Sequence, residues 1–226
     1  MDKFIEVFLL TNGSDTFPVC LEYLKKQTLG VKFTIVENMN IIDAMNYCIN
    51  NATSKYFVKL DDDMILHPKA LEYLNHCLYK YEYRIKHKDQ PEIGMYFCNL
   101  WEFWADRVVK CIKAYNVLIA KEIGFKKDQR GKIDRIYINE LKSRKISNIH
   151  DKSVIALHSL RNYNVQKNYR NIWMKNADIY NVKDFETKDR DQSILHNITI
   201  NHNEYDHKVK QLYKINKNFN FKKFIK

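Results

Sequence analysis

Residues 56–68 read YFVKLDDDMILHP: an apolar run, three consecutive aspartates and a second apolar run. Residues 56–60 predict a buried strand, and the helix beyond the aspartates is predicted to begin at Pro68. Three adjacent carboxylates repel one another unless a cation lies among them. Acids also favour helix N-termini, but residues 64–66 separate Asp61 from that helix. Since apolar residues on both sides hold the acids at a buried edge, the pattern favours a metal site over a solvated acidic loop.

The expected metal is Mn²⁺ or Mg²⁺, because oxygen ligands on a short turn suit these ions, which keep positions open for phosphate oxygens. The chain has only five glycines, and they form neither a GxGxxG pattern nor a Walker loop. We therefore expect a divalent ion to hold a diphosphate where other proteins use a glycine-rich loop.

Strands and amphipathic helices alternate along the first hundred residues. Strands are predicted at 4–10, 31–36, 56–60 and 93–100, with helices that begin near Thr16, Asn40 and Pro68. This alternation predicts a doubly wound α/β sheet with parallel strands. Farther on, the patterns predict a strand at 111–120, a helix around 133–141 and a strand at 154–157 that ends at His158. Beyond about residue 162 the apolar pattern weakens.

Ligands of such sheets bind beyond the carboxyl ends of the strands. Besides the three aspartates, the residues expected at that edge are Thr11 and Asn12, after the first strand, and Glu37, after the second.

Residues 56–68 resemble the strand, DxD motif and following helix of GT-A glycosyltransferases, particularly the family 2 type. The order of upstream elements agrees, so the resemblance covers residues 4–75 closely and 93–158 more loosely. It implies an α/β GT-A (Rossmann-like) fold, a mostly parallel sheet flanked by helices, with a basic helical C-terminal extension. The implied division is a catalytic core over 1–160, with nucleotide-sugar binding in 1–100 and an acceptor and catalytic half in 101–160, followed by the extension over 161–226.

The resemblance also implies roles for individual residues. Nucleotide-sugar binding would fall to Thr11, Asn12, Glu37, Asp61 and Asp62; the metal would be held by Asp61, Asp63 and His158, with Asp63 the direct ligand. The chain departs from the family where it has ENMN at 37–40 in place of an Asp-Asp-Gly-Ser turn. The nucleotide therefore stays open, with UDP the default.

The second half is expected to supply a general base and an acceptor site. Asp134 opens the predicted helix and resembles the acidic base of inverting members; the alternative is an acid that only favours a helix N-terminus. Asp151 and Asp191 are weaker candidates. His158 resembles a late histidine aimed at the metal or diphosphate, although a strand-end histidine is commonly structural. Trp101 and Trp104 offer rings for stacking on an acceptor sugar, or else pack in the core.

The charge is concentrated at the C-terminal end. The chain carries 38 Lys and Arg against 27 Asp and Glu, a net +11, and residues 207–226 hold seven lysines and no acid. Lysines interleaved with apolar residues suit an anionic membrane surface. A solvated tail and a helix packed on the core are the alternatives.

The predicted location is cytoplasmic, with peripheral contact to a membrane. No uncharged apolar run approaches the ~18 residues of a membrane span. The five cysteines are scattered without CxxC spacing, as in a reducing compartment.

These observations predict a metal-dependent, inverting glycosyltransferase of the hexosyltransferase type. It would move a sugar from a nucleotide-diphosphate sugar to an acceptor hydroxyl. The family resemblance alone implies a glycan, lipid-linked or protein acceptor and a place in the synthesis of surface polysaccharide, lipid or protein glycans. A nucleotidyltransferase of sugar phosphates is an alternative, but its loop is normally glycine-rich and basic, whereas residues 11–15 read TNGSD. A basic nucleic-acid-binding protein is another, but three aspartates would repel a phosphate backbone, so no nucleic acid is expected.

Overall fold

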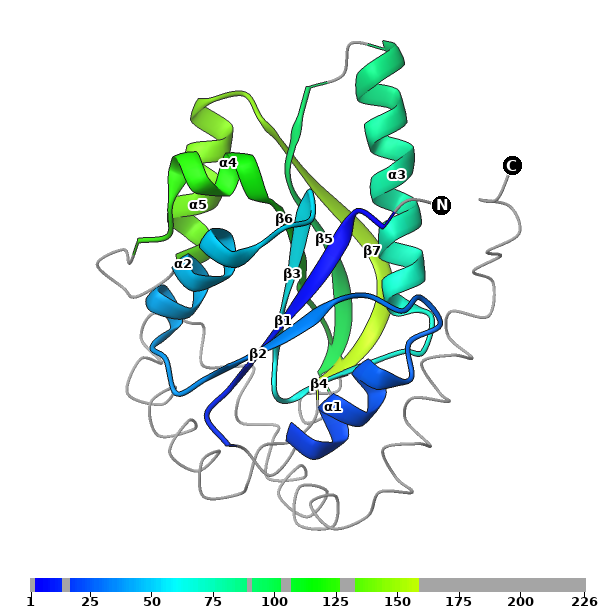
Figure 1. Ribbon diagram of the computed structural model, residues 1–226. Helices are drawn as coiled ribbons and strands as arrows, with labels where there is room; N and C mark the ends of the chain where they lie inside the picture. The colour runs from blue at the N-terminus through cyan, green and yellow to red at the C-terminus, as the bar shows by residue number, and fades with distance from the viewer. Residues whose placement is uncertain (1–2, 14–16, 89–90, 103–106, 127–132, 159–226) are drawn as a thin grey trace, which may run out of the picture.

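The computed structural model describes residues 3–13, 17–88, 91–102, 107–126 and 133–158 (Figure 1). The predictions for the extension 161–226, for its basic tail 207–226, for Asp191 and for Trp104 lie outside these residues. Within the described part of the chain, no helix is long and apolar enough to cross a membrane.

The core of the fold is a seven-stranded sheet in the order β2-β1-β3-β6-β5-β7-β4. Five strands share one direction, and β6 and β4 run against them. The prediction of a mostly parallel α/β sheet flanked by helices is therefore confirmed. The strands are β1 (Ile5–Thr11), β2 (Phe33–Glu37), β3 (Tyr56–Asp61), β4 (Met64–Leu66), β5 (Ile93–Glu102), β6 (Arg107–Asn116) and β7 (Ser147–His158).

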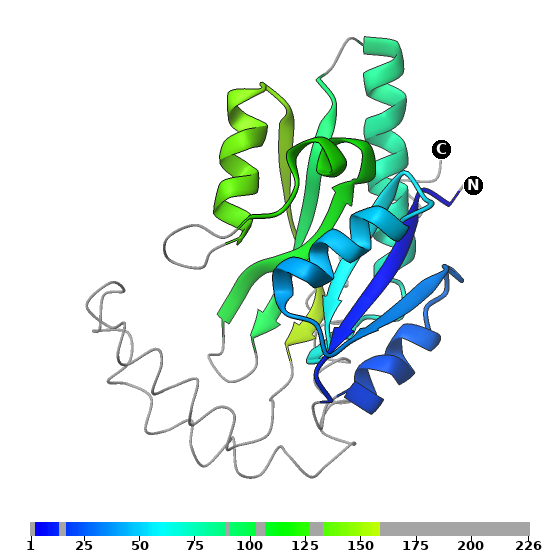
Figure 2. The ribbon, with the colours of Figure 1, turned by 60° about the vertical axis from the view of Figure 1, so that its left-hand side comes forward.

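Helices cover both faces of this sheet (Figures 1 and 2). One apolar core contains Val7 and Leu9 of β1 together with side chains of α1 (Phe17–Lys25) and α3 (Ala70–Lys88). The other contains Phe8 and Leu10, together with side chains of α2 (Ile41–Asn51), α4 (Val117–Ile123) and α5 (Ile133–Ser143). Because successive side chains of a strand point to opposite faces, a strand buried on both faces must be apolar throughout.

The predicted strand at 111–120 is wrong at its end. The strand stops at Asn116, and α4 begins at Val117. The Asn116 side chain accepts hydrogen bonds from the amides of Leu118 (3.1 Å) and Ile119 (3.3 Å), which makes it the N-cap of α4. Gly124 ends this helix with a φ of 67°. An asparagine eight residues before a glycine was the sequence signal for this short helix.

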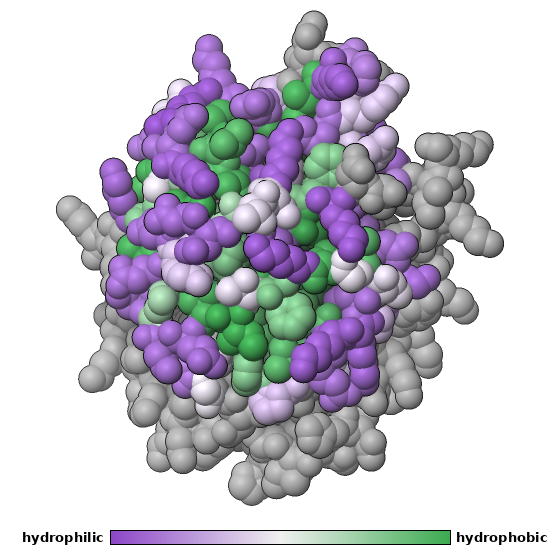
Figure 3. Space-filling model, viewed as in Figure 1, coloured by the Kyte–Doolittle hydropathy of each residue, from purple (hydrophilic) through white to green (hydrophobic). Residues whose placement is uncertain are grey.

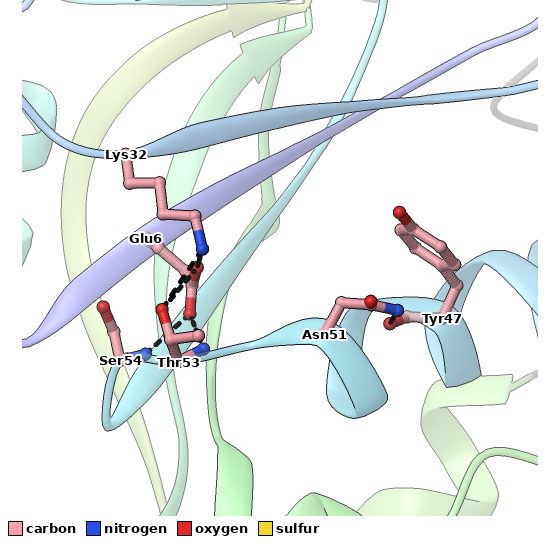
Figure 4. A network of polar contacts seen from close by, with 6 residues as sticks. All are labelled: Glu6, Lys32, Tyr47, Asn51, Thr53 and Ser54. Carbon is pink, nitrogen blue, oxygen red and sulfur yellow. Dashed lines mark hydrogen bonds and ion pairs between the residues drawn. The ribbon is translucent and has the colours of Figure 1, made fainter.

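A buried carboxylate fastens the amino-terminal half of β1 to the loop before β3 (Figure 4). Glu6 is 1% exposed; its carboxylate accepts hydrogen bonds from the amides of Thr53 and Ser54 and lies 3.4 Å from the Lys32 ammonium. In the preceding helix, the Asn51 side chain donates to the Tyr47 carbonyl. Glu6 therefore stabilises the fold at the end of β1 opposite the predicted binding edge.

Candidate active site

The predicted nucleotide-sugar residues meet at one edge of the sheet. β1, β2 and β3 are neighbours and end at Thr11, Glu37 and Asp61. In the register of these strands, Thr11 lies beside Glu37 and Leu10 lies beside Asp61. Because the three strands are parallel, their carboxyl ends form a common edge, and Asn12 directly follows it.

The three consecutive aspartates contact three different partners. Asp61 pairs with the Lys59 ammonium at 2.5 Å, and Asp62 accepts a hydrogen bond of 2.6 Å from the Thr11 hydroxyl. An Oδ2 atom of Asp63 lies 3.3 Å from Nε2 of His158. Because each carboxylate has its own partner, the electrostatic repulsion expected among the three neighbouring aspartates is reduced.

The contact between Thr11 and Asp62 organises the first loop. The Asn12 amide also donates to Asp62 (3.3 Å), and the Gly13 amide donates to the Thr11 hydroxyl (2.9 Å). Gly13 has a φ of 76°, a conformation that glycine adopts readily. Asp62 is 4% exposed, so the loop that begins at Thr11 is held by hydrogen bonds to a buried carboxylate.

Cys20 of α1 lies against the same turn and donates to the Asp62 carbonyl at 2.9 Å. Burial, reinforced by the negative charges of the three aspartates, raises the pKa of this thiol well above its ordinary value. A thiol in this state is not a nucleophile.

His158 reaches the aspartates through strand pairing over a long sequence distance. β7 pairs with β4, and His158 lies beside Met64, the residue that follows Asp63. β7 also pairs with β5, where His158 lies beside Glu102. Two of the three predicted metal ligands, Asp63 and His158, are thus brought together, whereas the Asp61 carboxylate is held by Lys59.

The donor set fits a divalent ion only in part. Among the described residues, no group of three or more His, Cys, Asp or Glu side chains is arranged to hold a metal. A carboxylate and an imidazole are nevertheless ligands that suit Mn²⁺, and ions of this kind complete their coordination with water and substrate phosphates. The Asp63–His158 pair therefore offers two ligands of the kinds that suit such an ion.

Two lysines that sequence reasoning missed lie on the sheet face beside this edge. Lys59 of β3 and Lys113 of β6 are directly opposite each other, and each is only 18% exposed. Like charges in this position destabilise a sheet unless they are paired. Lys59 pairs with Asp61, and Lys113 pairs with Asp134 of α5. A lysine inside the apolar run YFVKLD was the only sequence signal of this cluster.

Asp134 lies in the first turn of α5 and is held to the sheet by two donors, Lys113 and the Tyr115 hydroxyl (3.1 Å). Burial alone would raise its pKa, but the Lys113 charge and the hydrogen bonds from Lys113 and Tyr115 bring it below the ordinary value. Asp134 is therefore ionised at neutral pH. The prediction that Asp134 lies at the start of a helix is correct. Asp134 and Asp61, with their partners Lys113 and Lys59, form a cluster of two negative and two positive charges.

The remaining candidates do not converge in the same way. Trp101 belongs to the end of β5, where its backbone lies beside Val108 and Leu157. Asp151 is engaged by phenol groups at another part of β7. Apolar side chains are interspersed with charged ones over the surface in Figure 3; Ile35, Met39 and Ile41, on either side of Glu37, are among the exposed apolar residues.

A twisted, mostly parallel sheet with helices on both faces and an acidic turn after β3 defines the GT-A class of fold. Residues 1–85 match the family model described as Glycosyl transferase family 2. The first 85 residues of the chain therefore carry the family 2 sequence pattern within a fold of the GT-A class.

One solved structure agrees with this fold at a TM-score above 0.5, and two others are similar at lower scores. The chain is similar to a mannosyltransferase, PcManGT from Pyrobaculum calidifontis in complex with GDP-Man and Mn²⁺, at 14% identity and a TM-score of 0.51. The match covers 74% of this chain and 60% of that protein, so the chain spans less than two thirds of it. TarS of S. aureus in complex with UDP-GlcNAc matches at 12% identity, a TM-score of 0.46, and coverages of 70% and 59%. A197 from STIV matches at 11% identity, a TM-score of 0.48, and coverages of 69% and 85%. No curated protein matches the chain.

Proposed function

We propose that this protein transfers a sugar from a nucleotide-diphosphate sugar to an acceptor hydroxyl with inversion at the anomeric carbon. One observation carries the proposal: at the carboxyl edge of the sheet, the carboxylates of Asp61, Asp62 and Asp63 each contact a different partner. The partner of Asp63 is the imidazole of His158. The family 2 match and the donor complex of PcManGT support a nucleotide sugar as the substrate.

The nucleoside would lie along the ends of β1 and β2. Thr11, Asn12 and Glu37 offer a hydroxyl, an amide side chain and a carboxylate for base and ribose, and Asp62 keeps the Thr11 loop in place. Uridine remains the default base, with guanosine the first alternative to test.

Asp63 and His158 would hold Mn²⁺ or Mg²⁺ together with the donor diphosphate. The ion, when bound, neutralises the charge of the departing nucleoside diphosphate. Asp61 is a third candidate ligand once it exchanges its contact with Lys59.

In the transfer itself, Asp134 takes the proton of the acceptor hydroxyl. The acceptor oxygen forms a bond to the anomeric carbon as the bond from that carbon to the phosphate oxygen breaks, and the nucleoside diphosphate leaves. A single displacement of this kind inverts the anomeric configuration. Asp134 is ionised, which is the form that accepts a proton, and its contacts with Lys113 and Tyr115 hold the carboxylate in place, while the Lys113 ammonium lowers its basicity.

The first test is ligand binding. We expect at least one of UDP, GDP and their sugars to raise the melting temperature in the presence of Mn²⁺, because a ligand of the native state stabilises it. Asp63→Asn and His158→Ala should each remove this metal-dependent shift. Glu122→Gln, a change of an exposed surface carboxylate, should keep it. The absence of a metal-dependent shift with every nucleotide in the wild type would refute the proposal.

The second test separates binding from chemistry. With the donor found in the first test, Asp134→Asn should retain the thermal shift and lose transfer to added acceptors by roughly 100-fold or more. Glu140→Gln, on the exposed side of the same helix, is the matched control. Full turnover in Asp134→Asn would show that another residue is the base.

The basic tail is proposed to contact an anionic membrane on which the acceptor is presented. Its seven lysines at 207–226 are the reason for this part of the proposal. Sedimentation with vesicles containing phosphatidylglycerol, compared between the full chain and a chain ending at Asp206, tests it; equal binding by both would refute it.

A further inference from the structure

β7 changes its register against β5 in the middle of the strand. Phe97 lies beside His150, but Asn99 lies beside Val154 and Leu100 beside Ala156. Residues 151–155 therefore lie opposite only residues 98 and 99, which makes an irregular bulge with extra residues on β7. Asn99 bridges it, since its side-chain amide donates to the Lys152 carbonyl at 2.8 Å.

A single carboxylate, that of Asp151, organises this bulge. It accepts hydrogen bonds from the Tyr96 hydroxyl (2.6 Å), from the Tyr73 hydroxyl and from the Ser153 amide (2.8 Å). The Cys77 thiol lies 3.9 Å from the same carboxylate. The donors come from α3, β5 and β7, so Asp151 ties the bulge to the helix and the strand beside it.

Both phenols are built into the core, with Tyr73 5% and Tyr96 2% exposed. The Tyr73 hydroxyl also lies 2.9 Å from the Ser153 hydroxyl. A buried hydrogen-bonded network of this kind stabilises one local conformation of the chain, because an unsatisfied group would carry a desolvation penalty.

The extra residues decide which side chain of β7 arrives at the aspartates. If the register at Phe97 and His150 continued unchanged, Glu102 would lie beside Ile155. With the bulge, Glu102 lies beside His158, and His158 also lies beside Met64 of β4. In this register the His158 imidazole lies 3.3 Å from the Asp63 carboxylate.

We propose that Asp151 is a positioning residue, which holds the bulge of β7 and thereby sets His158 against Asp63. Its importance for catalysis rests on the proposed function, because there the Asp63–His158 pair belongs to the donor site. The positioning itself can be tested without a substrate.

The test is hydrogen–deuterium exchange of the full chain. In Asp151→Ala, we expect the amides of 154–158 to exchange roughly ten-fold faster or more, while those of 147–150 stay within about two-fold of the wild type. Tyr73→Phe/Tyr96→Phe, which keeps the ring packing, should give the same local pattern if Asp151→Ala folds poorly. Glu6→Gln, which alters the buried carboxylate at the start of β1, is the control and should not change 154–158 selectively.

A uniform increase along β7, or no increase at 154–158, would overturn the proposal, since a merely stabilising residue would not act on one half of the strand. Asp151→Asn keeps an acceptor for the Ser153 amide but loses the negative charge, so the amides of 154–158 should exchange faster than in the wild type and no faster than in Asp151→Ala.

Mn²⁺ binding followed by electron paramagnetic resonance gives the second readout. Asp151→Ala should weaken binding as much as His158→Ala does. If the wild type binds no Mn²⁺, the proposed function fails, while the exchange pattern still decides the role of Asp151.

Discussion

At the residue scale, the site depends on how charges are paired on a partly buried sheet face. Lys59 and Lys113 would repel each other across β3 and β6, and each is compensated by one carboxylate. Burial alone would lower the pKa of Lys59, but the charge of Asp61 raises it above its usual value. The lysines and their carboxylates therefore stabilise one another and fix Asp61 and Asp134 relative to the sheet.

Replacing Lys113 with methionine tests this pairing. We expect the pKa of Asp134 to rise, because burial then acts on it without the Lys113 ammonium, and the free energy of unfolding to fall by about 1 kcal/mol. A ¹³C NMR titration of the carboxyl carbons and urea denaturation measure the two effects. Lys113→Arg keeps the positive charge and should leave the pKa of Asp134 low. An unchanged pKa in Lys113→Met would contradict the pairing.

At the scale of elements, α5 is placed by a close approach to β5. A Cβ atom on Gly94 would lie 2.2 Å from Cδ2 of Leu141, and the Tyr137 hydroxyl donates to the Gly94 carbonyl at 3.2 Å. Tyr137 also stacks on Phe125, with ring centroids 5.0 Å apart. The absence of a side chain at Gly94 thus sets the distance between helix and sheet, and with it the height of Asp134 above the sheet.

Gly94→Ala is therefore expected to push α5 outward and to lower the free energy of unfolding by about 1–3 kcal/mol. Urea denaturation measures the loss. Gly30→Ala is the matched control, because a Cβ atom there would meet nothing within 4 Å; its effect should stay within roughly 0.5 kcal/mol. Equal effects of the two substitutions would show that the packing at Gly94 is not tight.

At the scale of the whole molecule, the hydrogen-bonded carboxylate of Asp151 makes stability depend on pH. Burial alone would raise the pKa of Asp151, but the hydrogen bonds from Tyr73, Tyr96 and Ser153 lower it. A carboxyl group whose pKa is lower in the folded than in the unfolded protein stabilises the fold above the unfolded value, which for aspartate is 3.8. That stabilisation disappears as the pH falls through the folded value.

We expect Asp151→Asn to unfold more easily than the wild type at pH 7, by about 1.5–3 kcal/mol. The difference should shrink below about pH 4, where the wild-type carboxyl group takes up its proton on unfolding and then also in the folded state. Urea denaturation of both proteins between pH 7 and about pH 3 measures it. A constant difference over that range would mean that the charge of Asp151 does not contribute.

Local patterns were sufficient for much of the fold. The apolar runs of β1 and β3, the Asn40 cap of α2 and the long amphipathic helix α3 are encoded within a few residues of where they form. The predicted strand at 111–120 was wrong at its end because apolar residues 117–120 fit a strand and a buried helix equally well, and the Asn116 cap decided between them.

The amino-acid sequence alone was enough to predict an acidic turn at the carboxyl edge of an α/β sheet, because strand periodicity and helix caps are local properties. The tertiary structure alone determined the partner of each aspartate, the antiparallel course of β4 and β6, and the meeting of Asp63 with His158. These features depend on the register between strands that are distant in sequence. A bulge held by the partly buried carboxylate of Asp151 shifts that register, and no periodicity within β7 records the shift.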